Sequence, residues 1–253
     1  MTGREMVAEN RRRKARLKRK AGKRAEIEMR GRISVSRCAE DFEYWAARTV
    51  VIRDKKTGRN VPFRLNAAQL EVLEIMEKMR LKGKPIRLIL LKARQWGGST
   101  LIQVYMAWIQ LIHKKNWHSV ICAHVKDSAR NIRGMYSTLL ENYPTSMTGG
   151  KEKIKLKGFE GAQNIKIIDR RECRVTIASA ESQDSVRGSD IAMAHLSETA
   201  YWKATPSRDP EDFMRAVCSS IPLEPLTLVA IESTANGVGN FFHTEWQRAT
   251  AGK

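Results

Sequence analysis

The chain has 253 residues, enough for one sizeable hydrophobic core, and 42% of them are apolar. Its formal net charge of +19 favours a polyanionic partner, with nucleic acid ahead of an anionic membrane surface. Four scattered cysteines without a CxxC pair argue against a zinc site and a disulfide framework. The longest apolar helix is too short to span a bilayer and no signal peptide is evident, so we expect a soluble intracellular protein.

The first 32 residues are dominated by arginine and lysine, including the run RRRKARLKRKAGKR at 11–24. Such a segment is either a solvated arm or a helix that becomes ordered on a nucleic acid or a protein partner. From Ile33 onward the composition is that of a globular protein. We therefore expect a basic N-terminal arm at 1–32 and a single folded domain at 33–253.

Apolar periodicity then predicts strands and helices that alternate along the chain. A short helix near 42–45 and a hairpin at 50–63 precede a helix that begins at Asn66 and ends at Gly83. The later expected elements are strands at 86–91, 119–123, 174–178, 191–196 and 226–231, helices at 100–113, 127–142 and 209–220, and a loop or hairpin at 144–161. Repeated strand–helix units with continuously apolar strands predict an α/β fold with a mostly parallel central sheet and helices on both faces.

The segment Ile86–Leu101, IRLILLKARQWGGSTL, joins an apolar strand to an apolar helix through a glycine-containing turn and a hydroxyl pair. This layout is typical of a phosphate-binding loop, whose backbone N–H groups hold polyphosphate at a helix N-terminus. The match to GxxxxGK[ST] is imperfect, because Gly98 stands where lysine is usual and Lys92 stands where glycine is usual. Either Lys92 or Arg94 is long enough to turn back over bound phosphates. The alternative is a tight turn with a surface lysine and arginine.

The run IAMAHLSE is a second candidate, and it ends in Ser197 and Glu198. In phosphate-loop ATPases a neighbouring strand ends in an acidic pair, of which the first residue holds Mg²⁺ and the second orients the attacking water. Glu198 keeps the second position, whereas Ser197 replaces the usual aspartate. Taken alone, this run favours a strand end whose serine and glutamate cap the next turn.

Three weaker signals accompany these two runs. The small polar residues of 233–237, STANG, follow an apolar strand, where they could sense a γ-phosphate or form an ordinary Asn-Gly turn. Gln69 could pair with adenine, although its spacing from Asn66 also fits a helix capping box. Arg187, followed by glycine, could hold a phosphate or a carboxylate, or it could be one of many surface arginines.

The order and spacing of these motifs resemble the ATPase domain of the large terminase subunit of tailed bacteriophages, the motor that packages viral DNA into proheads. Such proteins carry a loop of the form KxRQxGxS, in which lysine opens the motif, and residues 92–99, KARQWGGS, fit that form. The family also has a glutamine ahead of the loop, an Arg-Gly before an acidic strand that ends in Asp-Glu or Ser-Glu, and a Ser/Thr-rich coupling motif. Gln69, Arg187, Ser197, Glu198 and the segment at 233–237 match these features, and the resemblance covers roughly 35–250.

The resemblance implies a RecA-like (ASCE) P-loop ATPase fold with ATP and Mg²⁺ as cofactors. Glu198 would orient the attacking water, and Gln69 would bind adenine. The triphosphate would lie against the Walker A loop, made of Lys92, Arg94, Gln95, Trp96, Gly97, Gly98, Ser99 and Thr100. Mg²⁺ would be held by Ser99, Ser197 and Glu198, in part through water, and γ-phosphate loss would be relayed by Ser233, Thr234, Ala235 and Asn236.

The implied function is ATP hydrolysis that drives double-stranded DNA into a prohead in the cytoplasm of the host cell. The implied partners are DNA, the portal protein, the small terminase subunit and further copies of the chain in a ring, with a monomer possible in isolation. A neighbouring subunit would supply an arginine in trans, for which Arg130 and Arg133 are candidates. Complete large terminases also carry a nuclease domain. Because this sequence ends at Lys253, we expect no nuclease here, with the chain being a fragment or the nuclease being encoded separately.

Two other functions fit part of the pattern. A helicase-type translocase shares this core but needs a second one, for which the chain is too short. A non-catalytic basic DNA-binding protein with a decayed loop would account for Gly98 and Ser197. Magnesium-dependent ATP binding distinguishes a working loop from a decayed one.

Overall fold

The computed structural model describes residues 33–54, 57–150, 152–159, 161–180, 190–206 and 209–252. The expected basic arm at 1–32 and the candidate Arg187 lie outside these residues. Helix α6 (Lys126–Glu141) is described, but the side chains of Arg130 and Arg133 within it are not.

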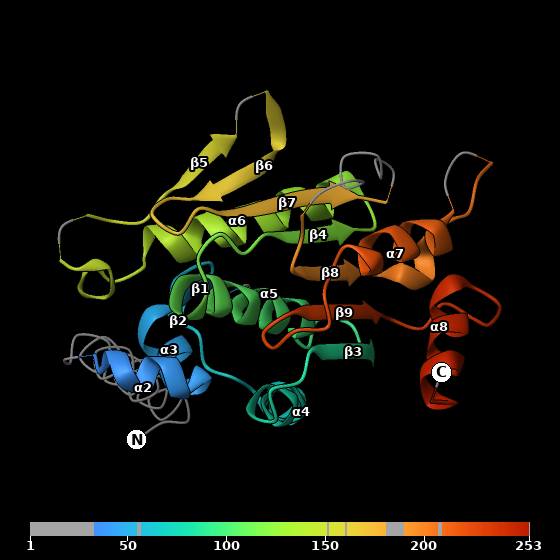
Figure 1. Cartoon of the computed structure of the whole chain (residues 1–253), viewed down its shortest axis with the longest axis horizontal. Coiled ribbons are helices and arrows are strands. Elements are labelled where there is room, and N and C mark those ends of the chain that lie inside the picture. The colour runs from blue at the N-terminus through green and yellow to red at the C-terminus, as the bar shows by residue number, and fades with distance from the viewer. Residues whose placement is uncertain are drawn as a thin grey trace, which may run out of the picture.

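A seven-stranded sheet forms the centre of the fold, in the order β3-β9-β8-β4-β7-β6-β5 (Figure 1). Its strands are β3 (Ile86–Leu91), β4 (Ser119–Ala123), β5 (Leu156–Phe159), β6 (Ala162–Ile168), β7 (Cys173–Ser179), β8 (Met193–Ser197) and β9 (Leu228–Ser233). Neighbours from β3 to β7 run parallel, whereas the pairs formed by β6 with β7 and with β5 are antiparallel. The prediction of a mostly parallel sheet is therefore confirmed.

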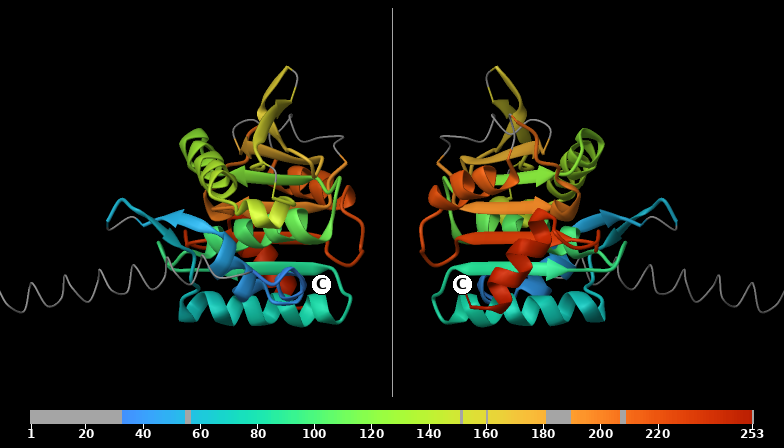
Figure 2. Two further views of the ribbon diagram at one scale, coloured as in Figure 1. Left: turned by 90° about the vertical axis from the view of Figure 1, so that its left-hand side faces the viewer. Right: turned by 90° about the vertical axis from the view of Figure 1, so that its right-hand side faces the viewer.

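Helices cover both faces of this sheet, and Figure 2 shows α6 and α7 on opposite sides of the strands. Alternate residues of β4 point into two separate cores: Ile121 belongs to the larger cluster with α5 and α6, and Val120 to the smaller one with α7 and α8. The remaining elements are α2 (Val35–Glu40), α3 (Phe42–Thr49), the hairpin β1 (Val51–Arg53) and β2 (Asn60–Pro62), α4 (Ala67–Leu81), α5 (Gly98–Trp108), a π-helical turn (Ile109–His113), 3₁₀ turns at Thr145–Thr148 and Thr199–Tyr201, α7 (Pro210–Ser219) and α8 (Phe241–Thr250).

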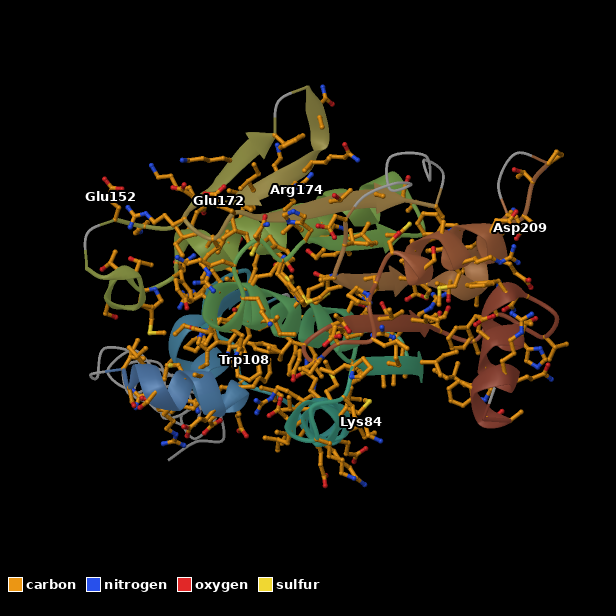
Figure 3. All side chains as sticks on the ribbon, viewed as in Figure 1. Lys84, Trp108, Glu152, Glu172, Arg174 and Asp209 are labelled. Carbon is orange, nitrogen blue, oxygen red and sulfur yellow. The ribbon has the colours of Figure 1, made fainter. Side chains whose placement is uncertain are left out.

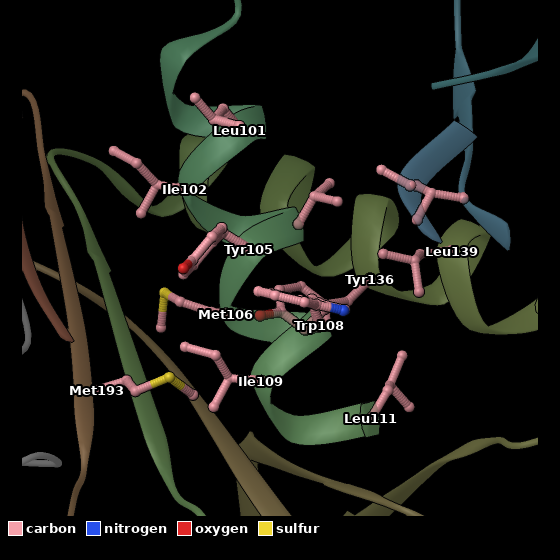
Figure 4. Close-up of a cluster of buried hydrophobic side chains, with 14 of the residues drawn as sticks. Leu101, Ile102, Tyr105, Met106, Trp108, Ile109, Leu111, Tyr136, Leu139 and Met193 are labelled. Atoms are coloured by element: carbon pink, nitrogen blue, oxygen red, sulfur yellow. The ribbon is translucent and has the colours of Figure 1, made fainter. Parts of the chain in front are cut away.

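The larger core is built around α5, which is buried on every side (Figure 4). Trp108 lies inside the molecule, whereas charged residues such as Lys84 and Asp209 lie at its periphery (Figure 3). Phe42 packs against Tyr105 and Trp108 with ring centroids 5.0 and 5.4 Å apart, and the Trp108 indole N–H donates to the Cys38 carbonyl at 2.8 Å. This packing joins the N-terminal helices to α5 and fixes the helix that follows the phosphate-loop segment.

Several elements differ from the sequence-based expectation. Helices α2 and α8 and strand β6 were not predicted, and β9 continues to Ser233 instead of ending at 231. On α4 the buried positions include Gln69 and Met76, while Leu70 is 39% exposed. None of the helices in the described part of the chain has the length and apolar character that a bilayer span requires.

Candidate active site

The ends of three strands meet at one edge of the sheet. In the parallel register Leu91 lies opposite Ser233, and Ser197 lies opposite Glu232, so β9 stands between β3 and β8. The Lys92 N–H continues the pairing by donating to the Ser233 carbonyl at 2.9 Å. The carboxyl ends of parallel strands are where α/β folds place their ligands, and the three candidate motifs are brought together here.

The turn between β3 and α5 is held from below by the start of α4. Gly97 adopts a φ of +90°, and a Cβ there would lie 2.7 Å from Gln69 Nε2, so this position requires glycine. The Gln69 amide donates to the Gly97 carbonyl at 2.8 Å, and Asn66 Nδ2 donates to the Trp96 carbonyl at 2.9 Å. Asn66 and Gln69 also form the expected capping box of α4. Gln69 thus supports the loop, and its pairing with adenine stays a prediction.

Gly98 has no space for the lysine that the usual motif carries. A Cβ on Gly98 would lie 2.5 Å from Cζ2 of the Trp96 indole, because that ring packs directly against the backbone. Gly98 begins α5, and the Gly97 N-cap offers no side chain to the first turn. The first N–H groups of a helix have no partner within it, so this end of α5 suits an anion.

Lys92 enters the site from the end of β3. Its ammonium lies 2.5 Å from Glu198 Oε1 and 2.9 Å from Glu232 Oε2, and its side chain is only 7% exposed. One cation therefore faces two carboxylates, and these three groups together carry a formal charge of −1. The arrangement brings the motif-opening lysine directly beside the predicted catalytic glutamate.

Glu198 follows β8 with a φ of +55°, a left-handed conformation that aims its side chain towards β9. Its Oε2 accepts hydrogen bonds from the Thr234 N–H at 3.1 Å and the Thr234 hydroxyl at 3.0 Å. Burial acts to raise the pKa of Glu198, but the hydrogen bonds from Lys92 and Thr234 outweigh it and hold that pKa below its ordinary value. Glu198 is therefore ionised at neutral pH.

The predicted coupling residues connect β9 to the turn after Glu198. The Ser233 hydroxyl accepts from the Ala200 N–H at 3.1 Å, and Asn236 Nδ2 donates to the Ala200 carbonyl at 2.9 Å. Tyr201, in the same turn, accepts hydrogen bonds through its hydroxyl from Thr234 at 3.2 Å and from exposed Arg94 at 3.5 Å. The Ala235 carbonyl in turn accepts from the Tyr201 hydroxyl at 3.5 Å. Arg94 thus lies at the mouth of the site.

Glu232 is the residue that the sequence interpretation missed. It lies within β9, is 0% exposed, and accepts hydrogen bonds at Oε1 from Ser99 at 2.6 Å and from Ser197 at 2.7 Å. Neutral His195 lies 3.3 Å away through Nε2, and its pKa is lowered to about 3 by burial and by the Lys92 charge. A glutamate inside an otherwise apolar run, LVAIES, is the signal that points to it.

The donor set at this edge fits a hard divalent cation. Ser99 supplies a hydroxyl, and Glu198 and Glu232 supply carboxylate oxygens, which are the ligand types that Mg²⁺ prefers. Within the described residues no group of three or more His, Cys, Asp or Glu side chains is placed to hold a metal. Mg²⁺ here would therefore depend on nucleotide phosphates and water as well as on protein oxygens. Beside Ser99 and Thr100, a cavity of about 720 Å³ extends between β1 and α6.

Solved structures with this fold come from tailed phages. The large terminase of bacteriophage HK97 superimposes with a TM-score of 0.62 at 16% identity, over 88% of this chain and 42% of that one. The large terminase of a thermophilic bacteriophage gives 0.52 at 15% identity, over 75% and 44%. The large terminase ATPase domain of Thermus phage P74-26, in a form with one arginine replaced by alanine, gives 0.50 at 18% identity, over 71% and 68%.

The chain therefore spans less than half the length of the first two of these proteins. No family model matches the sequence, and no curated protein matches it. The strand inserted between the loop strand β3 and the acidic strand β8 is the RecA-like (ASCE) arrangement that the resemblance implied. The chain has the fold of the ATPase domains of phage large terminases, as its motifs predicted.

Proposed function

We propose that this chain is an ATPase that couples ATP hydrolysis to the translocation of double-stranded DNA into a viral prohead. The observation that carries the proposal is the meeting of Lys92, Ser99, Glu198 and Thr234 at one sheet edge. These residues come from three strand ends and the first turn of α5, and their side chains contact one another directly or through Glu232. A surface turn without a ligand has no need of such an arrangement.

In this proposal the triphosphate lies against the N-terminus of α5. The N–H groups of 95–100 hold its oxygens, and Arg94, which is exposed at the mouth, closes over it. Lys92 neutralises phosphate charge from the strand side, in place of the lysine that Gly98 lacks. Gln69 would contact adenine through its second amide hydrogen while it keeps its bond to Gly97. When bound, Mg²⁺ would draw charge from the phosphates, with Ser99, Ser197 and Glu198 near it.

Glu198 is placed to orient the attacking water. It is ionised and held by two hydrogen bonds from Thr234, so its free lone pairs can accept from a water in line with the γ-phosphate. Release of phosphate changes the load on Glu198, and Thr234 passes that change to the coupling segment of Ser233, Ala235 and Asn236. The Asn236 bond to Ala200 extends the same connection to the turn after β8.

The assembly proposed around this site follows from charge and from the fold. A formal charge of +19 attracts the phosphates of DNA. Portal protein, small terminase subunit and further copies of the chain in a ring are the other proposed partners. An arginine from a neighbouring copy would complete the transition-state charge, with Arg130, Arg133 or Arg187 as candidates.

The test compares ATP hydrolysis by the wild-type chain, Glu198→Gln and the exposed control Glu74→Gln. We expect Glu198→Gln to lower the turnover number by roughly 100-fold or more while ATP binding with Mg²⁺, measured by calorimetry, is retained. Glu74→Gln should leave both unchanged. Equal turnover in Glu198→Gln would show that the assigned base is wrong. If the wild-type chain binds no ATP in the presence of Mg²⁺, the non-catalytic DNA-binding alternative holds.

A further inference from the structure

Glu232 is a charged side chain at the centre of the sheet. Its side chain is 0% exposed, within a strand whose residues are all buried. An ionised carboxylate in such a place is costly unless cations and hydrogen bonds compensate for its lost hydration. Among the described residues its cationic partner is Lys92, which Glu232 shares with Glu198, so one lysine faces two negative charges at this edge.

The two oxygens of Glu232 have different surroundings. Oε1 accepts from the hydroxyls of Ser99 and Ser197 and lies beside His195 Nε2. Oε2 faces the Lys92 ammonium at 2.9 Å but accepts no hydrogen bond from the described residues. One oxygen is therefore fixed in place by the protein, while the other, equally buried, has only an ionic contact.

The bond from Ser99 is informative because a serine hydroxyl has one hydrogen and two lone pairs. Its hydrogen is directed to Glu232 at 2.6 Å, which leaves the lone pairs for another ligand. A hydroxyl that gives its hydrogen to a carboxylate is a better electron donor to a cation. Glu232 therefore stands behind Ser99 as an outer ligand stands behind a metal-binding group.

Ser197 explains why this carboxylate is on β9. Ser197 occupies the position on β8 where an aspartate would normally support the metal, and it lies opposite Glu232 in the parallel register. Its hydroxyl donates to Glu232 at 2.7 Å, so the serine orients a carboxylate from the neighbouring strand. His195, two residues earlier, lies on the same side and is itself placed 3.4 Å from Gln103.

We propose that Glu232 supplies, from β9, the carboxylate that Ser197 does not supply on β8, and that it positions Mg²⁺ through Ser99. The inference rests on the proposed function, since it concerns the metal that accompanies ATP. Glu232 is a positioning residue in this role, because it acts on the cation through the Ser99 hydroxyl. Lys92 occupies Oε2 in the nucleotide-free protein and turns towards phosphate when the metal–nucleotide complex binds.

The experiment measures the gain in affinity for a non-hydrolysable ATP analogue when EDTA is replaced by Mg²⁺, by calorimetry on the full chain. The variants are Glu232→Gln and the double variant Ser197→Asp/Glu232→Ser, which moves the carboxylate back to β8. Glu77→Gln is the matched control, because Glu77 is also a shielded carboxylate paired with a cation, Arg80, but lies outside the site. Binding of Mn²⁺ with the same analogue, followed by electron paramagnetic resonance, gives a second readout.

We expect Glu232→Gln to reduce the Mg²⁺-dependent gain by roughly 10–100-fold, while affinity in EDTA is unchanged or tighter because a negative charge is removed. The double variant should recover most of the gain, and Glu77→Gln should match the wild type. A purely structural role would weaken binding equally with and without Mg²⁺, which would overturn the proposal.

The outcomes separate the inference from the proposed function. If the wild type gains affinity with Mg²⁺ and Glu232→Gln gains as much, the inference fails and the proposed function stands. If the wild type itself shows no gain, both fail. If Glu232→Gln does not fold by circular dichroism, the double variant decides: recovery of the gain supports the inference, and its loss in a folded protein overturns it.

Discussion

Thr234 donates two hydrogen bonds to the same carboxylate oxygen of Glu198, one from its backbone N–H at 3.1 Å and one from its hydroxyl at 3.0 Å. The two residues are 36 positions apart and belong to the ends of neighbouring parallel strands. Any displacement of the residues after β9 therefore acts directly on the orientation of the predicted catalytic carboxylate. This contact is a physical route by which hydrolysis and movement of the coupling segment can be linked.

We predict that Thr234→Val slows hydrolysis more than it weakens binding. Valine keeps the shape of threonine but removes the hydroxyl donor to Glu198, while the backbone N–H donor remains. Loss of one hydrogen bond to a charged group, about 1.5 kcal/mol, corresponds to a turnover number lower by about tenfold. Steady-state kinetics should show a Michaelis constant close to that of the wild type. Thr250→Val, at the exposed end of α8, is the control, and a wild-type turnover number in Thr234→Val would contradict the role of the hydroxyl.

We predict that a side chain at Gly98 destabilises the protein. In Gly98→Ala the new methyl group meets the Trp96 indole at 2.5 Å, and displacing a packed ring costs roughly 1–3 kcal/mol in the free energy of unfolding. Gly134, inside α6, has nothing within 4 Å of an added Cβ, so Gly134→Ala should raise stability by about 0.5–1 kcal/mol. Urea unfolding of both variants gives the comparison. The same clash means that Gly98→Lys would not restore a usual phosphate loop, and unchanged stability in Gly98→Ala would show that the indole moves aside freely.

Lys92 and Glu232 should prove energetically coupled. Lys92→Met leaves Glu232 buried without its cation, which we expect to cost roughly 3–5 kcal/mol in the free energy of unfolding without nucleotide. In Lys92→Met/Glu232→Gln neither charge remains, so the double variant should be more stable than the sum of the two single effects predicts. A double-mutant cycle from urea unfolding measures the coupling, for which we expect about 1–3 kcal/mol. Additive effects would mean that the 2.9 Å contact contributes nothing to stability.

His113 makes stability depend on pH. Burial, together with the charge of Arg80, lowers the pKa of His113 to about 4, and its ring packs edge-on to Trp108 with centroids 4.5 Å apart. The unfolded chain binds the proton near pH 6.5, before the folded protein does, so stability is lost as the pH falls from about 6.5 towards 4. The slope from this residue is at most about 1.4 kcal/mol per pH unit. Urea unfolding at pH 7, 6 and 5 should give a shallower dependence for His113→Phe, and an identical dependence would exclude His113 as its source.

Much of this fold is written in local patterns. Continuous apolar runs identify β3, β4 and β8, because a strand buried on both faces has no polar position. The glycine-containing turn before an apolar helix identifies the phosphate-loop segment. Helix α8 and strand β6 escaped prediction, since half-exposed elements carry weaker patterns and gain much of their stability from packing.

By itself the sequence determined that three polar strand ends would lie at one edge of a parallel sheet, because parallel strands all present their carboxyl ends to the same side. It also determined that Lys92 and Glu198 would be among them. Only the tertiary structure decided that β9 lies between β3 and β8, which places Glu232 against Ser99 and Ser197, and that Trp96 fills the space beside Gly98. Which strands become neighbours is a matter of pairing between residues far apart in the chain, and no local pattern in the sequence encodes it.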